Sequence, residues 1–208
     1  MAQAFYTTLE KRASCTYEEK RSVFIGDAAP VATEEEALAF IAEIKAKYPD
    51  ARHHVYAYLL RENAKNRYSD DHEPQGTAGM PVLDVLRKGG FTDAVIVVTR
   101  YFGGTLLGAG GLVRAYTAAA SGAVKEAGTR TYRTYRPVLL SVSYTDYNRL
   151  LPELEKKAVR VLDTDYAEEV TLSLSMPVEE YPDFERLVTE ATAARAVLIP
   201  SEPIFDHD

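Results

Sequence analysis

The sequence has no tryptophan, a single cysteine and no long apolar run. One cysteine, Cys15, excludes an internal disulfide and fits a reducing compartment. No window approaches the ~18 apolar residues of a membrane-spanning helix, and the start lacks the basic segment and apolar core of a secretory signal. We therefore expect a folded cytoplasmic protein with no membrane association.

A basic excess is also lacking. The 208 residues carry a formal net charge of −7, from 24 Lys and Arg against 31 Asp and Glu. Residues 1–130 are balanced, with 16 of each sign, whereas residues 131–208 hold 8 basic and 15 acidic residues. This distribution argues against nucleic-acid binding by the whole surface, but leaves room for a local basic site in the first part. It also makes the acidic second part a candidate surface for a protein partner.

The first part of the chain mixes strands and helices. Strands are predicted over 22–31, 53–60 and 94–99, the last as a continuous apolar run typical of a strand buried on both faces. Thr33 and Glu36 form a capping box before one helix, and a second is predicted over 78–88 with Thr77 as its N-cap. Residues 61–79 have no periodicity and are predicted to form a long loop, and a third helix is expected from about Gly111 to Gly128.

The second part follows the order β-α-β-β-α-β, which is that of the ferredoxin-like unit. The sequence therefore predicts an α+β protein of two domains, 1–133 and 134–208, with the boundary in the polar segment 131–136.

The segment TRYFGGTLLGAGGLVRAY (99–116) places five glycines between two arginines. A strand, a glycine-rich turn and a helix N-terminus together direct free backbone N–H groups at one point, which suits an anion such as phosphate. The predicted anion-binding residues are Arg100, Gly103, Gly104, Gly108, Gly110, Gly111 and Arg114. Alternatively, the glycines serve turns and packing, and Arg114 pairs with a carboxylate of residues 70–73. The spacing matches neither a P-loop nor a dinucleotide fingerprint.

The segment SDDHEPQGTAGMP (69–81) gathers carboxylates and a histidine. Asp70, Asp71, Glu73 and His53 are candidates for acid-base chemistry or for holding a divalent metal. The alternative is a solvated loop that pairs with arginines, and because no recognised ligand spacing occurs, we assign no metal and no cofactor.

Several other side chains are of types that bind bases or act as nucleophiles, but none of them lies in a recognised motif. Tyr56, Tyr58, Tyr101 and Phe102 could stack on bases beside Arg100, but alternating aromatics in strands more often belong to the core. His53 and His54 alternate faces, so at most one lines a given site. Ser14, Ser22 and Ser69 lack a nucleophile motif, as does Cys15.

The strings DDHEPQGTAGMP and VTRYFGGTLLGAGGLVRAY resemble the IMPACT family, in particular its bacterial YigZ-like members. The resemblance implies a first domain like the second domain of ribosomal protein S-five and a second like a plait domain of elongation factor G. It implies no established enzyme activity. Eukaryotic relatives regulate translation through a protein partner, using an additional domain with no counterpart here, so that partner is not carried over.

The sequence departs from the family at two places. The family pattern D-D-G-E-P-S-G-T has glycine and serine where this chain has His72 and Gln75. If that glycine has a positive φ, His72 must accept a strained backbone or the loop must shift.

These observations favour a non-catalytic binding protein whose first domain recognises RNA or another phosphate-bearing part of the translation machinery. The alternative is an enzyme acting on a small phosphorylated or acidic substrate, with Asp70, Asp71, Glu73 and His53 beside the anion site. A protein-binding adaptor that uses the acidic second domain is the third interpretation.

Overall fold

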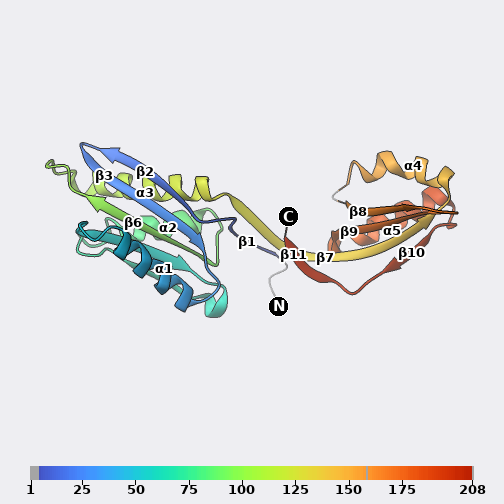
Figure 1. Cartoon of the computed structure of the whole chain (residues 1–208), viewed down its shortest axis with the longest axis horizontal. Coiled ribbons are helices and arrows are strands. Elements are labelled where there is room, and N and C mark those ends of the chain that lie inside the picture. The colour runs from blue at the N-terminus through green and yellow to red at the C-terminus, as the bar shows by residue number, and fades with distance from the viewer. Residues whose placement is uncertain (1–4, 158, 208) are drawn as a thin grey trace. The chain divides into compact units, whose positions relative to one another are not determined.

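The computed structural model describes residues 5–157 and 159–207 (Figure 1). These divide into two compact units, one of residues 6–131 and one of residues 132–207 together with Phe5. The division lies close to the boundary predicted between residues 133 and 134. In the described part of the chain, no helix has the length and apolar character needed to cross a membrane.

The first unit is built on a five-stranded antiparallel sheet, in the order β2-β3-β6-β4-β5. Its strands are β2 (Ala13–Glu19), β3 (Ser22–Pro30), β4 (His53–Leu59), β5 (Asn66–Ser69) and β6 (Ala94–Tyr101). Strand β6 lies in the centre and is buried from Ala94 to Arg100, as its apolar run predicts. This part of the chain also contains strand β1 (Phe5–Leu9) and the 3-10 turn η1 (Glu62–Ala64).

Helices cover both faces of this sheet. Helices α2 (Gly79–Lys88) and α3 (Gly108–Ala127) pack on one face, where Phe24, Ile96 and Val98 enter the core. Helix α1 (Glu34–Lys47) packs on the other, against Val95 and Val97. Alternate residues of β6 therefore belong to two different cores, because successive side chains of a strand point to opposite faces.

The predicted start of α1 is confirmed. The Thr33 side chain accepts a hydrogen bond from the Glu36 backbone N–H at 3.2 Å, and the Glu36 carboxylate accepts one from the N–H of Ala32. Three acidic residues in the first turn and two lysines in the last also stabilise the helix, because their charges interact favourably with the helix dipole.

Three local predictions are corrected by the structure. Residues 66–69 of the predicted loop form the edge strand β5, which is short and mostly exposed and so leaves no periodic signal. Helix α2 begins after Ala78, without a side-chain cap from Thr77. Helix α3 begins at Gly108, about one turn earlier than expected, because glycines are unfavourable in a helix but do not prevent one.

The second unit has the element order that the sequence predicts, β-α-β-β-α-β. Its strands are β7 (Thr129–Val142), β8 (Arg160–Tyr166), β9 (Val170–Pro177) and β10 (Val197–Pro200), and its helices are α4 (Tyr144–Leu154) and α5 (Tyr181–Thr192). These four strands lie in the order β8-β9-β7-β10 and pair antiparallel, and β1 also pairs with β7 in the same sheet. A short 3-10 turn, η2 (Val178–Glu180), precedes α5, and a last strand, β11 (Ile204–His207), pairs with the start of β7.

Candidate functional site

The loop between β5 and α2 is held by Asp70. Its carboxylate accepts hydrogen bonds from the backbone N–H groups of Gly76, Ala78 and Gly79, at 2.9, 3.1 and 2.8 Å. Asp70 thus supplies the N-terminal cap of α2 that the sequence predicts for Thr77, and the Thr77 hydroxyl instead donates to the carbonyl of Pro74. Because both oxygens of Asp70 are committed to the backbone, this residue has a structural role.

Glu73 points into the interior of the first unit. The Arg100 guanidinium donates to its Oε1 at 2.5 Å, and the Tyr116 hydroxyl donates to the same oxygen at 2.8 Å. The Glu73 side chain is 4% exposed and the Arg100 side chain is 8% exposed. Burial, and then the nearby Glu73 carboxylate, raise the pKa of Tyr116, so its hydroxyl stays a donor. This buried triad ties the loop to β6 and α3.

Asp71 and the two histidines complete the anchoring. The Asp71 carboxylate accepts from the backbone N–H of His54 at 2.6 Å, and the Asp71 carbonyl lies 2.8 Å from His53 Nδ1. The His54 ring lies on the other face of the sheet, where its Nε2 is 3.0 Å from the carbonyl of Tyr48. The prediction that His53 and His54 face opposite sides is confirmed. In residues 5–157 and 159–207, no three His, Cys, Asp or Glu side chains form a group suited to a metal ion.

His72 has the strained backbone that its position in the motif suggested. Its φ is 70°, in the left-handed region, and the φ of the preceding Asp71 is 42°. A glycine would adopt this conformation without a steric cost, whereas a residue with a Cβ is disfavoured there. Of the two outcomes expected at this position, a strained His72 or a shifted loop, the structure shows the strained backbone.

The glycine turn follows β6 and lies against the β2–β3 turn. A Cβ on Gly103 would lie 2.0 Å from the backbone carbon of Arg21, and the Gly103 N–H donates to Ser22 Oγ at 3.0 Å. The Arg21 guanidinium also donates to Thr105 Oγ1 at 3.2 Å. Glycine at 103 is thus required by close backbone packing, and this packing brings Arg21 beside the turn.

The turn continues into the N-terminus of α3. Gly104 and Gly108 have positive φ values of 81° and 71°, whereas Gly110 and Gly111 lie in the first turn of the helix. The N-cap residue, Leu107, makes no side-chain hydrogen bond, so it caps none of the first backbone N–H groups of α3. The five glycines therefore have three roles. Gly103 allows close backbone packing, Gly104 and Gly108 adopt positive φ, and Gly110 and Gly111 lie in the first turn of α3.

The two arginines of the predicted anion site differ in their environment. Arg100 lies beneath the turn and is committed to Glu73, which corrects its assignment as a direct anion contact. Arg114 is exposed and, in the part of the chain that the structure describes, makes no hydrogen bond or ion pair. The alternative pairing of Arg114 with residues 70–73 is therefore wrong, because Arg100 takes that place. Since α3 begins at Gly108, Arg114 lies in its second turn, where the helix dipole opposes a cation less than at the first.

Of the four aromatic residues considered for base stacking, one is well exposed. Tyr58 is buried against α1, and the rings of Tyr56 and Tyr58 stack on each other with centroids 6.4 Å apart. Tyr101 is half-buried, whereas Phe102 is 56% exposed and has the Arg100 guanidinium 5.7 Å from its ring centroid. Sequence reasoning included Phe102 but missed Arg21, since only the packing of Gly103 brings that arginine to the turn.

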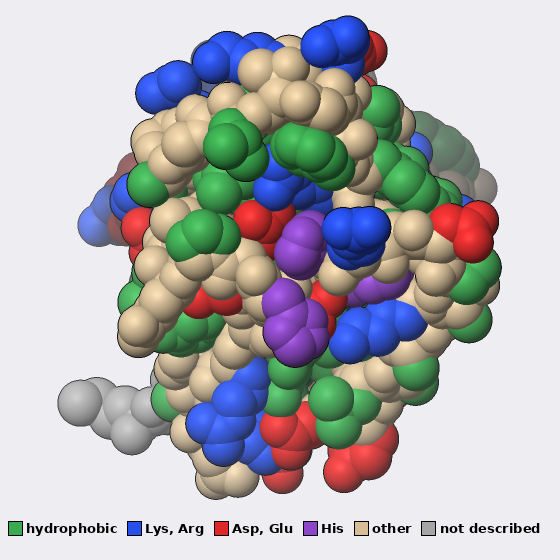
Figure 2. All heavy atoms as spheres, turned by 90° about the vertical axis from the view of Figure 1, so that its left-hand side faces the viewer, with side chains coloured by type: hydrophobic (Ala, Val, Ile, Leu, Met, Phe, Trp, Pro, Cys, Tyr) green, Lys and Arg blue, Asp and Glu red, His purple; other side chains and the backbone are tan. Residues whose placement is uncertain are grey.

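Figure 2 shows this end of the first unit. Histidine side chains reach the surface together around a shallow hollow, with lysine and arginine side chains beside and above them and acidic side chains deeper inside.

The serines and the cysteine considered as nucleophiles have structural roles. Ser22 is buried, Ser14 donates to Asp27, and Cys15 packs against α3 at Gly122.

The chain matches two family models over the regions just described. Residues 20–124 match the Impact N-terminal domain, and residues 140–195 match a domain of unknown function, DUF1949. The chain is 36% identical over 178 residues to the IMPACT family member YvyE of Bacillus subtilis, covering 85% of this chain and 82% of that protein. This protein belongs to the IMPACT family.

Two further comparisons agree with this assignment. The chain is 31% identical over 186 residues to the IMPACT family member YigZ of Escherichia coli, covering 88% of this chain and 91% of YigZ. A crystal structure described as that of a hypothetical protein is similar over 96% of this chain and 98% of its own, with a TM-score of 0.60 at 29% identity. Membership of the family and a mixed α/β fold of two domains are thereby established.

Proposed function

We propose that this IMPACT family member is a non-catalytic cytoplasmic binding protein that recognises phosphate groups of RNA or of an RNA-containing part of the translation machinery. The first unit supplies the anion site. We also propose that the first unit has the fold of the second domain of ribosomal protein S-five and that the second unit is ferredoxin-like. The element order of the second unit supports the latter assignment.

The observation that carries the proposal is the environment of Arg114. Its exposed guanidinium pairs with no carboxylate of residues 5–157 and 159–207, and it lies on the same helix as a glycine-rich N-terminus whose N-cap residue makes no side-chain hydrogen bond. Arg21, in the β2–β3 turn, donates from its guanidinium to the Thr105 hydroxyl of the glycine turn, and it pairs with no carboxylate among the residues that the structure describes. Cations and free backbone N–H groups together favour an oxygen-rich anion.

Phe102 indicates which kind of nucleic acid fits. Its exposed ring follows directly after β6, within two residues of the glycine turn. An aromatic side chain beside cations binds unpaired bases by stacking, at about 1–3 kcal/mol per base, whereas a duplex does not offer its base faces. We therefore propose single-stranded RNA, with phosphates on Arg21, Arg114 and the turn and a base on Phe102.

The enzyme alternative gains no support from the geometry. Asp70 caps α2, Glu73 pairs with Arg100, and Asp71 accepts the backbone N–H of His54. Each candidate carboxylate thus has a partner that stabilises the fold.

Fluorescence anisotropy with a labelled 20-nucleotide single-stranded RNA tests the proposal. We expect Arg21→Ala/Arg114→Ala to weaken binding at least tenfold, since two phosphate contacts are lost. The matched control is Arg12→Ala/Lys88→Ala, which removes two exposed cations that pair with Glu43 and Asp84 in the same unit. Equal weakening by both variants would show a general charge effect and contradict the proposed site.

Phe102→Ala should weaken binding to single-stranded RNA and leave any binding to the duplex unchanged. Equal affinity of wild type and Phe102→Ala for the single strand would contradict the stacking contact, but not the phosphate site.

A further inference from the structure

The sheet of the second unit is covered by helices on one face. Val138, Leu140 and Val142 of β7 point to the core formed with α4 and α5, as do Leu172 and Leu174 of β9. The intervening residues point to the opposite face, since successive strand residues alternate. Within the described residues, no helix contributes to this opposite face, which we call the open face.

One side of the open face is apolar. Leu139 of β7 lies opposite Ile199 of β10, and Val197 of β10 lies opposite Ser141. The exposed fractions of Leu139, Val197 and Ile199 are 44%, 53% and 55%. These three side chains are neighbours on the sheet, so they form one contiguous exposed apolar patch, and a contiguous apolar patch is a candidate site for binding another molecule.

The other side of the open face is acidic. Asp163 and Asp165 of β8 lie opposite Ser173 and Thr171 of β9, and both aspartates are exposed. A bulge in β8 causes this placement, because the register skips Leu162 between Val161 and Asp163. Without the bulge, Leu162 and Thr164 would occupy these positions. β-bulges re-aim side chains in this way.

Basic side chains are nearly absent from the open face. Arg160 is the one basic residue at an open-face position among the described residues of β8, β9, β10 and 137–142 of β7. It lies opposite Ser175. Its guanidinium is engaged by the Tyr135 hydroxyl and the His207 carbonyl, at 2.6 and 2.9 Å. The remaining acidic side therefore repels phosphate and attracts cations, in agreement with the 15 acidic residues against 8 basic ones in 131–208.

We propose that the open face is a docking surface for an amphipathic helix of a partner protein, with an apolar stripe flanked on one side by lysine or arginine. The stripe packs on Leu139, Val197 and Ile199, and the flanking cations reach Asp163 and Asp165. Four strands spaced at ~4.8 Å offer a width of roughly 15–20 Å, enough for one helix of ~10 Å diameter. This surface is independent of the anion site of the first unit.

The test uses the intact protein and a fluorescein-labelled 14-residue helical peptide of leucine and lysine, with the lysines on one flank of the leucine stripe. We expect Val197→Thr/Ile199→Thr to weaken peptide binding at least tenfold in anisotropy titrations, and Asp163→Asn/Asp165→Asn to weaken it at least threefold. Threonine keeps the strand propensity, and a circular dichroism melt verifies that each variant folds. Backbone amide NMR shifts on peptide addition should map to β7, β8, β9 and β10.

Matched controls separate this surface from general attraction. Glu168→Gln/Glu169→Gln removes two acidic charges in the β8–β9 turn, and Leu38→Thr removes an exposed apolar side chain in the first unit. Both should change the affinity less than twofold. Weakening by Glu168→Gln/Glu169→Gln equal to that by the aspartate variant, or shifts confined to other surfaces, would overturn the proposal. A dimer of the wild type that Val197→Thr/Ile199→Thr dissociates in sedimentation would also overturn it, because the occupant would then be a second copy.

Discussion

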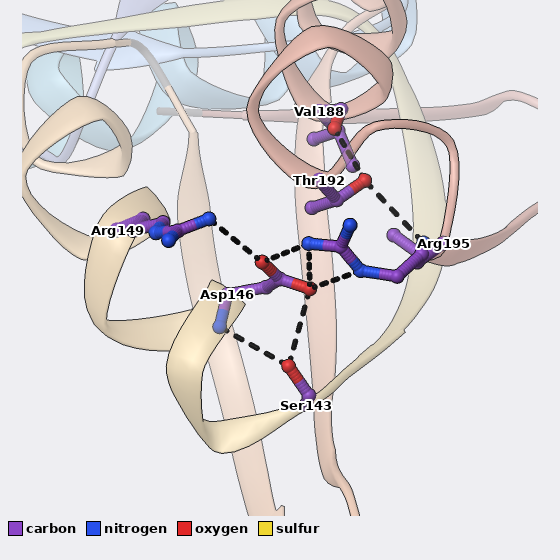
Figure 3. Close-up of polar contacts among 7 residues, drawn as sticks. Ser143, Asp146, Arg149, Val188, Thr192 and Arg195 are labelled. Atoms are coloured by element: carbon purple, nitrogen blue, oxygen red, sulfur yellow. Dashed lines mark hydrogen bonds and ion pairs between the residues drawn. The ribbon is translucent and has the colours of Figure 1, made fainter.

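Each unit contains a cluster in which one carboxylate joins distant segments, and the two clusters differ in the exposure of the arginine. In the first unit, Glu73 and Arg100 are both buried, and Arg100 Nε has no hydrogen-bond partner among the described residues. In the second unit, Asp146 is 3% exposed, but the Arg195 side chain that binds it is 59% exposed (Figure 3). Removal of the carboxylate therefore leaves a buried cation in one unit, whereas in the other the arginine can return to water.

The Asp146 cluster joins the start of α4 to the turn after α5. Arg195 donates to both carboxylate oxygens, at 2.8 and 3.0 Å from Nη2, and Ser143 donates at 3.1 Å. Ser143 is also the N-cap of α4, accepting the N–H of Asp146 at 3.2 Å. Thr192 supports the same turn by accepting the N–H of Ala196 and donating to the Val188 carbonyl. The comparison predicts a large effect for Glu73 and a smaller one for Asp146.

The largest expected effect is that of Glu73→Gln. It leaves the Arg100 guanidinium buried without a charge partner, and we expect a loss of about 3–5 kcal/mol in the free energy of unfolding, measured by urea titration. Glu62→Gln, at an exposed position, should change it by less than ~0.5 kcal/mol. If Glu73→Gln does not fold, Glu73→Leu/Arg100→Met should restore folding, because the pair is then replaced by apolar groups. A loss below ~1 kcal/mol for Glu73→Gln would contradict this account.

Asp70→Ala should have the next largest effect. It removes the acceptor for three backbone N–H groups at the start of α2, and a lost cap costs about 0.5–2 kcal/mol. Asp50→Ala, at an exposed position after α1, is the control and should be neutral in the same denaturation assay. Amide exchange in the first turn of α2 should also rise in Asp70→Ala, and unchanged exchange there would rule out the capping role.

Asp146→Asn should destabilise the protein less than Glu73→Gln, and in a manner that depends on pH. The bonds from Arg195 hold the pKa of Asp146 below its ordinary value of 3.8, despite the opposing effect of burial. A carboxyl whose pKa is lowered in the folded state stabilises the fold above its unfolded pKa and loses this effect as the pH falls through its folded pKa. The stability difference from wild type should therefore be full at pH 7 and shrink below pH 3.8. A difference that does not change with pH would contradict the role of the ion pair.

The smallest expected effect is that of His72→Gly. Relief of the left-handed backbone at φ 70° is offset in part by the greater freedom of glycine in the unfolded chain, so we expect a gain of between zero and ~1 kcal/mol. Gln75→Gly, in the same loop but without a positive φ, should be destabilising. A loss of stability in His72→Gly equal to that in Gln75→Gly would show that the strain is not significant.

Much of the fold could be predicted because its signals are local. The apolar run of β6, the capping box of α1 and the whole of α5, 181–192, follow from periodicity and capping chemistry. Strand β5 was missed because four mostly exposed residues at a sheet edge bury too little to leave a pattern. The strand β2 was likewise not predicted, although it alternates in burial.

The candidate site was predicted less completely, since its decisive contacts join residues far apart in the sequence. Glu73 is bound by residues 27 and 43 positions away, and nothing local distinguishes Arg100 as its partner from Arg114. Asp70 caps a helix that begins nine residues later, beyond the reach of a capping-box pattern. Arg21 reaches the glycine turn from a hairpin 84 residues from Thr105.

The most direct test of the central claim is the salt dependence of single-stranded RNA binding by the wild type and Arg21→Ala/Arg114→Ala. For single strands, the slope of log K against log salt concentration changes by about 0.7 for each phosphate contact. The account predicts that the variant binds more weakly and with a slope smaller in magnitude by about 1.4. An unchanged slope would contradict the assignment of the glycine turn and its two exposed arginines as the phosphate site.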